Sequence, residues 1–436
     1  MQPKKVVIIG AAGRDFHNFN MFFRDNPLYR VEAFTAAQIP DIAGRRYPAE
    51  LAGKLYPHGI LIYEEEKLPQ LIKKFGIDVA VLSYSDLNYV TVMRKSAVVN
   101  AAGADFWLLG PKSTMLKSKK PVVAVCAVRT GCGKSQTTRY VIDYLKKKGK
   151  KVVAVRHPMP YGDLKKQIWQ RYETPEDLNK YNCTIEEREE YEPLIRKGVV
   201  VYAGVDYAEI LRRAEKEADI VLWDGGNNDF PFFKPDVMIT VADPLRPGHE
   251  QMYYPGEVCA RMADVVVINK ENSAARKNIE AVRRSIKIIN PKAAIVDADS
   301  EITVDEPGKI RGKKVIVIED GPTVTHGGMA YGAGAVAARR YGCRVIDARK
   351  YAAGSLKKVY EKYPHIRKVL PSMGYYPEQL RELERTVEKS RCEAVIIGTP
   401  ADLGSVLRIK KPMARVKYEL KEIGKAKLQV FLTKVL

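Results

Sequence analysis

The sequence predicts an α/β protein in which mainly parallel sheets are covered by helices. Several apolar runs, such as VVAVCAV at residues 122–128, are continuous rather than alternating, which is typical of strands buried on both faces of a sheet. Between these runs lie segments with helical spacing of apolar residues, such as LPQLIKKFG at 68–76. The 436 residues, 46% of them hydrophobic, exceed the about 100–200 residues of one ordinary domain, so two or three units are expected.

Three α/β units are expected along the chain. A Rossmann-like N-terminal domain is predicted at residues 1–116, a central domain with a mainly parallel sheet at 121–300, and a C-terminal α/β domain at 301–436. The lysine-rich LKSKKP before the central domain indicates a linker, because its proline precedes a new strand. Further strands are expected in YRVEAFT, GILIY, VAVLSY and FWLLG, then in KVVAVR, VVVYAG, DIVLWD, VMITVAD, DVVVINK and AAIVDAD, and finally in KKVIVIEDGP, CRVIDAR and EAVIIGTP.

The first strand ends in a turn that contains Gly10 and Gly13, part of the fingerprint of dinucleotide-binding folds. The second strand ends at Thr35, where an NAD site would have an acidic side chain, so NAD and FAD are not expected. A helix start that holds a phosphate or carboxylate of another ligand, with Arg14 and His17 in reach, is favoured. Glycines that only shape the turn are the alternative.

Composition limits the classes of function. The formal charge is +21, but the lysines and arginines are spread in short runs, so a solvated surface or a site for a highly anionic small molecule is favoured over nucleic-acid binding. The six cysteines show no spacing of a disulfide framework or zinc site. No apolar run approaches the roughly 20 residues that cross a bilayer, and the start lacks a cleavage site. A cytoplasmic protein without a membrane partner is expected, with a homodimer left open.

The central domain is predicted to bind a nucleotide at VCAVRTGCGKSQTTRY, residues 125–140. The common phosphate-binding loop, G-x-x-x-x-G-K-S/T, would have glycine where Val128 stands. A second form, K-G-G-x-G-K-T/S, fits better and begins with a basic residue, here Arg129. Lys134 is expected to reach the β- and γ-phosphates, and the Ser135 hydroxyl to bind Mg²⁺. The nucleotide-binding residues predicted in this loop are Thr130, Gly131, Cys132, Gly133, Lys134, Ser135 and Gln136.

Two further stretches are assigned to the same site. Asp224 ends an apolar run and is predicted to bind Mg²⁺ through water, with Gly225 and Gly226 allowing close approach of a substrate. The strand after the P-loop helix leads into Arg156, His157 and Asp163. The two basic residues are assigned, with Lys134 and Arg129, to catalysis, and Asp163 to the metal.

The base of the nucleotide is expected to lie near VVVINKEN. Asn269 and Lys270 match the N-K-x-D motif of GTPases, but Asn272 stands where guanine is bound by an aspartate. An amide cannot accept both guanine N–H bonds, whereas its NH₂ group could donate to adenine. ATP is therefore favoured over GTP.

A ligand site is also predicted in EDGPTVTHGGMAYGAG, in the third unit. Five polar residues crowd a loop between a strand and a helix: Glu319, Asp320, Thr323, Thr325 and His326. The glycines at 327, 328, 332 and 334 allow close backbone approach. We expect this segment to fold over the γ-phosphate side of the P-loop and hold the acceptor, with His326 within about 15 Å of Lys134.

The whole chain resembles the cyclic 2,3-diphosphoglycerate synthetases and their relatives described as GTPases. The resemblance rests on GAAGRDFHNFN, AVRTGCGKSQ, VRHPMPYGDL, TIEEREEYEP, WDGGNNDFPF, DPLRPGHE, EDGPTVTHGGM and IIGTPADL. It implies ATP-dependent closure of a phosphoanhydride between the two phosphates of 2,3-bisphosphoglycerate. The substrate expected from it is an anionic, phosphorylated small molecule. Three alternatives stay open: a GTPase switch with a protein partner, a kinase or ligase acting on another small anion, and nucleic-acid binding by the basic surface.

The substrate-binding residues predicted from all these stretches are Arg14, Gly225, Gly226, Asp320, Thr325, His326, Gly327 and Gly328. The predicted metal ligands are Ser135, Asp224 and Asp163. The cofactors expected are Mg²⁺, with ATP or GTP as co-substrate.

Overall fold

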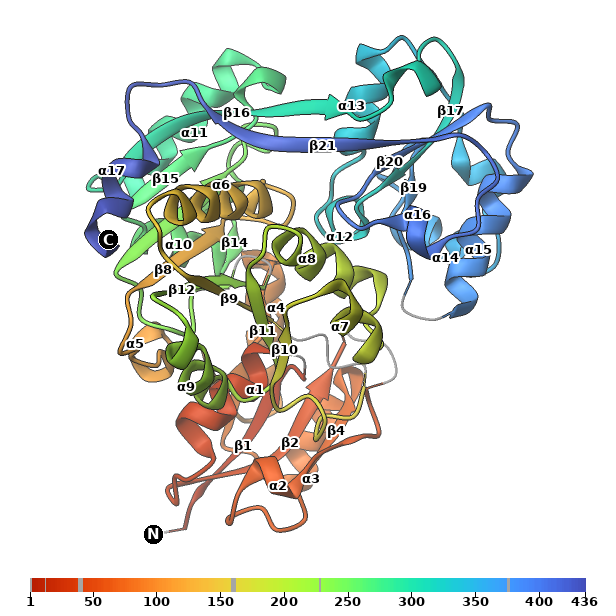
Figure 1. Cartoon of the computed structure of the whole chain (residues 1–436). Coiled ribbons are helices and arrows are strands. Elements are labelled where there is room, and N and C mark those ends of the chain that lie inside the picture. Colours follow the sequence, from red (N-terminus) through yellow and green to blue (C-terminus); the bar gives the residue numbers. More distant parts are fainter. Residues whose placement is uncertain (1, 12, 38–41, 158–161, 227–228, 375–376) are drawn as a thin grey trace.

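The computed structural model describes residues 2–11, 13–37, 42–157, 162–226, 229–374 and 377–436. Two large sheets organise these residues, and helices cover them, so the predicted α/β class is confirmed (Figure 1). The motifs VRHPMPYGDL, WDGGNNDFPF and GAAGRDFHNFN each run partly over residues outside this description, at 158–161, 227–228 and 12.

The N-terminal sheet has the strand order β3-β4-β2-β1-β5-β7. Its central strands run parallel, and only the short β3 is antiparallel to its neighbour β4. Aromatic residues of the first helix pack on this sheet, with Phe16 stacked on Tyr47 at 4.6 Å between ring centres. The elements are β1 (Lys4–Ile9), α1 (Arg14–Asn18), β2 (Tyr29–Ala36), β3 (Arg46–Tyr47), α2 (Ala49–Ala52), β4 (Ile60–Glu64), α3 (Leu68–Phe75), β5 (Val79–Leu82), β6 (Leu87–Asn88), α4 (Tyr89–Ala101), β7 (Asp105–Trp107) and α5 (Pro111–Thr114).

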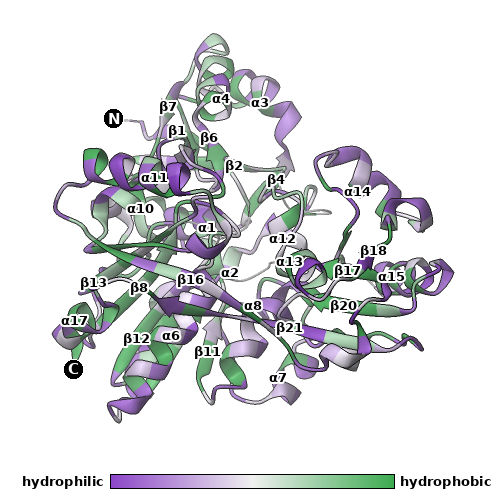
Figure 2. Cartoon of the chain, turned by 90° about the horizontal axis from the view of Figure 1, so that it is seen from above, coloured by the Kyte–Doolittle hydropathy of each residue, from purple (hydrophilic) through white to green (hydrophobic). Residues whose placement is uncertain are grey.

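The central part is a parallel sheet with only β10 antiparallel, in the order β10-β11-β9-β12-β8-β13-β15. Its strands are almost fully buried, as the continuous Val/Ile runs predict, because helices lie on both faces (Figure 2). The elements are β8 (Val122–Ala127), α6 (Lys134–Lys147), β9 (Val152–Arg156), β10 (Gln170–Tyr172), α7 (Pro175–Lys180), α8 (Ile185–Ile195), β11 (Val200–Ala203), α9 (Tyr207–Glu217), β12 (Ile220–Gly225), β13 (Val237–Ala242), β14 (Tyr253–Tyr254), α10 (Gly256–Met262), β15 (Val265–Ile268) and α11 (Arg276–Ile289).

Two long strands connect the central part to the C-terminal part within one sheet. The first half of β16 pairs in parallel with β15, and its second half pairs antiparallel with β21, which in turn pairs with β20. The predicted domain limit at 300/301 therefore falls inside β16. The remaining elements are β16 (Ala294–Val304), β17 (Lys314–Glu319), α12 (Gly321–Val324), α13 (Ala333–Arg340), β18 (Arg344–Val345), α14 (Leu356–Lys362), β19 (Leu370–Pro371), α15 (Pro377–Lys389), β20 (Ala394–Gly398), α16 (Leu403–Val406), β21 (Met413–Glu422) and α17 (Leu428–Leu432).

The end of the chain returns to the central part. Figure 1 shows β21 running back beside β16, and α17 lying near α6. Leu428 and Leu432 of α17 are fully buried in the same apolar cluster as Val141 and Leu145 of α6. The helix that begins at the P-loop is thus packed against residues almost 300 positions later in the chain.

None of the helices in the described part of the chain combines the length and the apolar character needed to cross a bilayer.

Candidate functional site

The loop between β8 and α6 has the geometry of a phosphate-binding loop. Gly131 and Gly133 have positive φ angles of 80° and 110°, and a Cβ on Gly133 would lie 2.0 Å from the Asn269 side-chain nitrogen. Among the described residues, only Asp86, Asn182 and Lys270 have positive φ without being glycine. Val128 therefore has an ordinary backbone conformation, which explains why the glycine of the common motif is dispensable here.

Lys134 begins α6 and points at the end of β12. Its Nζ donates to Asp224 twice, to the backbone oxygen at 2.5 Å and to Oδ1 at 2.8 Å. Asp224 also accepts from the Thr138 hydroxyl at 2.6 Å and from Arg156. Burial, followed by the nearby Arg156, lowers the pKa of Lys134 to about 8. Burial alone would raise the pKa of Asp224, but Arg156 and Lys134 outweigh it and hold that pKa below its usual value. Thr138 is one α-helical turn after Lys134, and no role was predicted for it.

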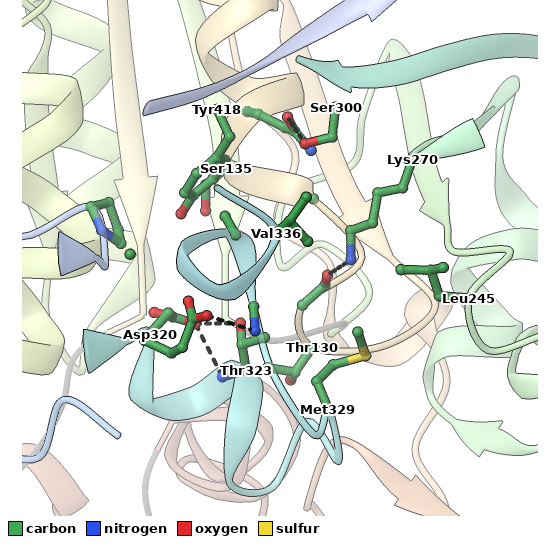
Figure 3. Close-up of a pocket in the computed structure, with 18 of the residues that line it drawn as sticks. Thr130, Ser135, Leu245, Lys270, Ser300, Asp320, Thr323, Met329, Val336 and Tyr418 are labelled. Atoms are coloured by element: carbon green, nitrogen blue, oxygen red, sulfur yellow. Dashed lines mark hydrogen bonds between the residues drawn. The ribbon is translucent and has the colours of Figure 1, made fainter. Parts of the chain in front are cut away.

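Mg²⁺ fits this place by the chemistry of its side chains. Ser135 lines the cavity described below (Figure 3). The Asp224 carboxylate lies beside the P-loop lysine. A hydroxyl and a carboxylate at these two positions are the usual magnesium ligands of P-loop proteins. Asp163, the third predicted ligand, is instead exposed in a shallow depression with Arg45 and His58, apart from the cavity that holds Ser135. Within the described residues, no group of three or more His, Cys, Asp or Glu side chains forms a metal site of its own.

Asn269 and Lys270, the N-K motif, form hydrogen bonds with the backbone of the phosphate-binding loop. Asn269 donates to the Cys132 backbone oxygen at 3.0 Å, and Lys270 donates to the Gly131 oxygen at 2.5 Å and to Asp243 at 2.9 Å. Asp243, for which no role was predicted, is 2% exposed and also pairs with Arg246 at 3.0 Å.

The two other polar residues predicted near the nucleotide bind β16. Asn272 lines the cavity and donates to the Ser300 backbone oxygen at 2.8 Å. Gln136 accepts from the Ser300 hydroxyl at 3.1 Å. Cys132 is buried, and burial raises the pKa of its thiol to about 11, so it stays protonated at neutral pH.

The segment after β17 does fold against the P-loop, as expected from the sequence. Arg129 donates to the His326 backbone oxygen at 2.9 Å, and Arg246 donates to the Gly327 oxygen at 2.6 Å. Thr130 and Thr323 line the same cavity and lie close together (Figure 3). The His326 side chain, however, is exposed and does not line this cavity.

The other predicted groups of this segment make local contacts. The N–H groups of Gly327 and Gly328 donate to the Pro322 and Thr325 backbone oxygens, and the Thr325 hydroxyl donates to Gly321. Asp320 lines the cavity and accepts from the Thr323 N–H and hydroxyl (Figure 3).

Four carboxylates line one cavity of about 400 Å³ together with the P-loop residues Gly131, Gly133, Lys134 and Ser135. They are Glu189 and Glu190 of α8, Glu319 at the end of β17, and Asp320. Glu190 pairs with Arg156. Glu319 accepts three backbone N–H groups at the start of α13, at 2.8 to 3.0 Å, and burial raises its pKa to about 7. Glu319 and Asp320 both belong to the ligand loop predicted from the sequence. Glu189 and Glu190 lie in the motif TIEEREEYEP, which carried part of the resemblance, but no role was predicted for either.

Arg14 and His157 lie in a different, buried place, between the N-terminal and central parts. Arg14 pairs with Asp229 at 2.7 Å and stacks on Phe230 at 3.7 Å, and His157 lies 3.2 Å from Asp229. Burial, followed by Arg14, holds the pKa of His157 well below its usual value, so its imidazole is neutral. Neither residue lines the cavity.

Gly226 is near the same cluster, because its Cβ would lie 2.5 Å from His157. Gly225 has a positive φ of 30°, and a Cβ there would meet the ring of Trp223. The close approach that these two glycines permit is thus to side chains of the protein.

Arg129 joins three parts of the molecule. Its guanidinium lies 2.5 Å from Asp86 after β5, stacks on Tyr253 at 3.7 Å, and reaches the His249 ring at 3.1 Å, besides the His326 carbonyl. It is 4% exposed and also borders the cavity.

The chain is similar over nearly its whole length to the arginine synthetase ArcE of Thermococcus kodakarensis, with 61% identity over 432 residues that cover 99% of this chain and 96% of that protein. No family model matches. Among solved structures, LpxK of Aquifex aeolicus in complex with ATP has a TM-score of 0.44 at 15% identity, covering 84% of this chain and 99% of that chain. The hydrogenase maturation factor HypB of Archaeoglobus fulgidus has a TM-score of 0.25 at 16% identity, covering 41% and 80%. Likeness at these TM-scores indicates no function.

Proposed function

Because the chain belongs to the family of arginine synthetase ArcE, we propose that it forms arginine in a reaction driven by a nucleoside triphosphate, with ATP favoured. The observation that best supports this proposal is the shared cavity, in which a P-loop faces four carboxylates. Acidic side chains suit a substrate with amino or guanidino nitrogens, and they oppose one with several phosphates.

The chemistry follows from the product. Arginine carries a guanidinium, and the amino acid with oxygen in place of one terminal nitrogen is L-citrulline. Transfer of the γ-phosphoryl group to this ureido oxygen breaks the bond between the β,γ-bridging oxygen and the γ-phosphorus and releases ADP. Ammonia then adds to the ureido carbon, and phosphate leaves with the electron pair of the C–O bond. Each step depends on positioning and on neutralising phosphate charge.

The residues of the P-loop have defined tasks in this proposal. Lys134 exchanges its bond to Asp224 for the β- and γ-phosphates, and the backbone N–H groups of the loop bind the phosphate oxygens. Ser135 and Asp224 would hold Mg²⁺, which when bound neutralises the triphosphate charge. Arg156 lies between Asp224 and Glu190, on the side where the phosphoryl group would be transferred.

The closure of 2,3-bisphosphoglycerate into a cyclic anhydride stays the second candidate. The resemblance described above and the basic Arg156 beside the P-loop lysine favour it. Both reactions begin with transfer of a γ-phosphoryl group to an oxygen of a small acceptor, so one P-loop geometry serves either. The carboxylates of the cavity are the reason to place it second, since a bisphosphate would lie close to four acidic groups.

The test combines both substrates. Purified protein is incubated with Mg²⁺ and ATP or GTP, either with L-citrulline and ammonium or with 2,3-bisphosphoglycerate, and arginine, nucleoside diphosphate and phosphorus NMR spectra are followed. We expect arginine and ADP in equal amounts, and neither with Lys134→Ala. A cyclic anhydride without arginine would support the second candidate, and hydrolysis independent of both acceptors would favour a nucleotide switch.

A further inference from the structure

Glu189 is one of the most deeply placed carboxylates of the cavity. It lies in α8, whose first turn is held by a capping box between Thr184 and Glu187. The N–H of Ile185, at the start of this helix, donates to the backbone oxygen of Gly374 in the C-terminal part at 3.3 Å. The helix therefore lies where the two parts meet, and Glu189 is only 4% exposed.

One carboxylate oxygen of Glu189 is fully occupied by the protein. Its Oε1 accepts from the Ser372 hydroxyl at 2.6 Å and from the Thr399 hydroxyl. Ser372 in turn accepts from the Gly321 N–H at 2.9 Å, and Thr399 from the Ala401 N–H at 3.3 Å. Because both hydroxyl oxygens already accept a backbone N–H, their protons are directed at Glu189.

The other oxygen, Oε2, is buried and has no hydrogen-bond partner among the described residues. Within the described residues, no other oxygen of the four cavity carboxylates is both buried and without a hydrogen-bond partner. Glu319 and Asp320 accept backbone N–H groups, and Glu190 pairs with Arg156. A buried, unpaired acceptor costs free energy, so one that borders a cavity indicates a donor supplied by a ligand.

Glu189 also lies on the reacting side of the nucleotide site. Its neighbour Glu190 pairs with Arg156, which pairs with Asp224, which binds Lys134. This chain of ion pairs places α8 beside the part of the P-loop that would meet the γ-phosphate. Burial, followed by Asp320, raises the pKa of Glu189 well above its usual value, so its ionised carboxylate is a stronger base than an ordinary glutamate.

We propose that Oε2 of Glu189 binds the nitrogen nucleophile as ammonium and accepts its proton. The inference rests on the proposed arginine synthesis and names the place of its second substrate. One N–H bond of ammonium breaks and its proton bonds to Oε2, which leaves ammonia with a lone pair. That nitrogen bonds to the phosphorylated ureido carbon, the C–O bond breaks, and phosphate leaves. A further proton from the nitrogen passes to the phosphate, so the product is a guanidinium with five N–H bonds.

Glu189→Gln tests this, because the amide keeps its oxygen toward the two hydroxyls and places an NH₂ donor where the acceptor was. Glu192→Gln is the matched control, since Glu192 is in the same helix and 5% exposed but pairs with Arg196 outside the cavity. Arginine formation is measured over ammonium concentration at saturating ATP and L-citrulline. For Glu189→Gln we expect kcat/KM for ammonium to fall about 10- to 100-fold, as for loss of a charged hydrogen bond. The KM values for ATP and L-citrulline should stay within about twofold, as should every constant of the control.

A second readout separates binding of the nitrogen from the first phosphoryl transfer. With ATP carrying ¹⁸O at the β,γ-bridge, scrambling that depends on L-citrulline and occurs without ammonium should persist in Glu189→Gln. An unchanged kcat/KM for ammonium, or loss of the scrambling along with it, would overturn the role of Glu189 while wild-type arginine synthesis stands. A wild-type protein that forms no arginine would overturn both proposals. If Glu189→Gln does not fold, Glu189→Asp replaces it, because its carboxylate is shorter by one methylene. The same results are then expected, and the same results would overturn the proposal.

Discussion

At the scale of single residues, the site is held by side chains that satisfy one another. Lys134 and Asp224 bind each other, and Arg156 bridges Asp224 to Glu190. A buried charge without a partner costs several kcal/mol, so such a network keeps cations and carboxylates in place until phosphates compete for them. The protonation state of Lys134 therefore becomes part of nucleotide binding.

We predict that ATP binding takes up a proton above about pH 8. The pKa of free Lys134 is lowered to about 8 by burial and by Arg156, whereas bound phosphates favour the charged amine and raise that pKa. Above pH 8 the free lysine is largely neutral and must be protonated on binding, so affinity falls as the pH rises. Calorimetric titration at pH 9 in buffers of different ionisation enthalpy measures this uptake. In Lys134→Arg, whose guanidinium stays charged, the uptake should vanish; equal uptake in both proteins would contradict the assignment.

Asn272 is expected to contact the base of the nucleotide and to favour adenine over guanine. Asn272→Asp should weaken ATP binding and shift preference toward GTP, because a carboxylate can accept both guanine N–H bonds and cannot donate to adenine. The same change places a carboxylate against the Ser300 carbonyl, to which the amide now donates. Dissociation constants for ATP and GTP are compared in the wild type, Asn272→Asp and Asn272→Ala. If the ATP-to-GTP ratio is the same in all three, Asn272 does not contact the base.

At the scale of elements, what could be predicted from the sequence was local. The loop at 128–135 follows from one strand, two glycines and the start of one helix, all within a dozen residues. Glu189 gave no such signal: TIEEREEYEP has the composition of a solvated helix, and its burial depends on Ser372 and Thr399 some 200 positions away. Contacts between distant segments also explain the outcome for Arg14 and His157, which were predicted to bind a ligand. Both instead pair with Asp229, in a buried contact between the N-terminal and central parts.

Arg129 is the side chain that joins these elements. Arg129→Met should destabilise the protein by about 3–5 kcal/mol, because Asp86 would lose its guanidinium partner in a buried place. Replacing both residues, in Arg129→Met with Asp86→Asn, should recover part of this loss, since no buried charge is then left over. Urea unfolding followed by circular dichroism gives the comparison. If Arg129→Met alone changes the free energy of unfolding by less than about 1 kcal/mol, as substitutions on the surface usually do, the result would contradict the burial of this pair.

At the scale of the whole molecule, one sheet connects the P-loop with the C-terminal carboxylates of the cavity. β16 and β21 link the central strands to β20, and β20 pairs with β17, which ends at Glu319. The apolar runs predicted each strand but not which strands pair, because strand order depends on packing between distant segments. Whether residues 1–116, 121–300 and 301–436 behave as separate domains stays a prediction.

The return of the chain end to the P-loop helix leads to the last prediction. Leu432 is fully buried beside α6, whereas Val430, two residues earlier in α17, is 66% exposed. Leu432→Ala should cost about 2–5 kcal/mol, because the cavity it leaves lies in the core of the central sheet rather than at a free chain end. Val430→Ala is the matched control and should change the stability by less than about 0.5 kcal/mol. Thermal unfolding by calorimetry, with nucleotide affinity measured alongside, distinguishes the two. If both variants unfold at the same temperature, α17 does not stabilise the helix that carries Lys134. If only Leu432→Ala unfolds at a lower temperature and also binds ATP more weakly, the end of the chain supports the phosphate-binding loop through packing alone.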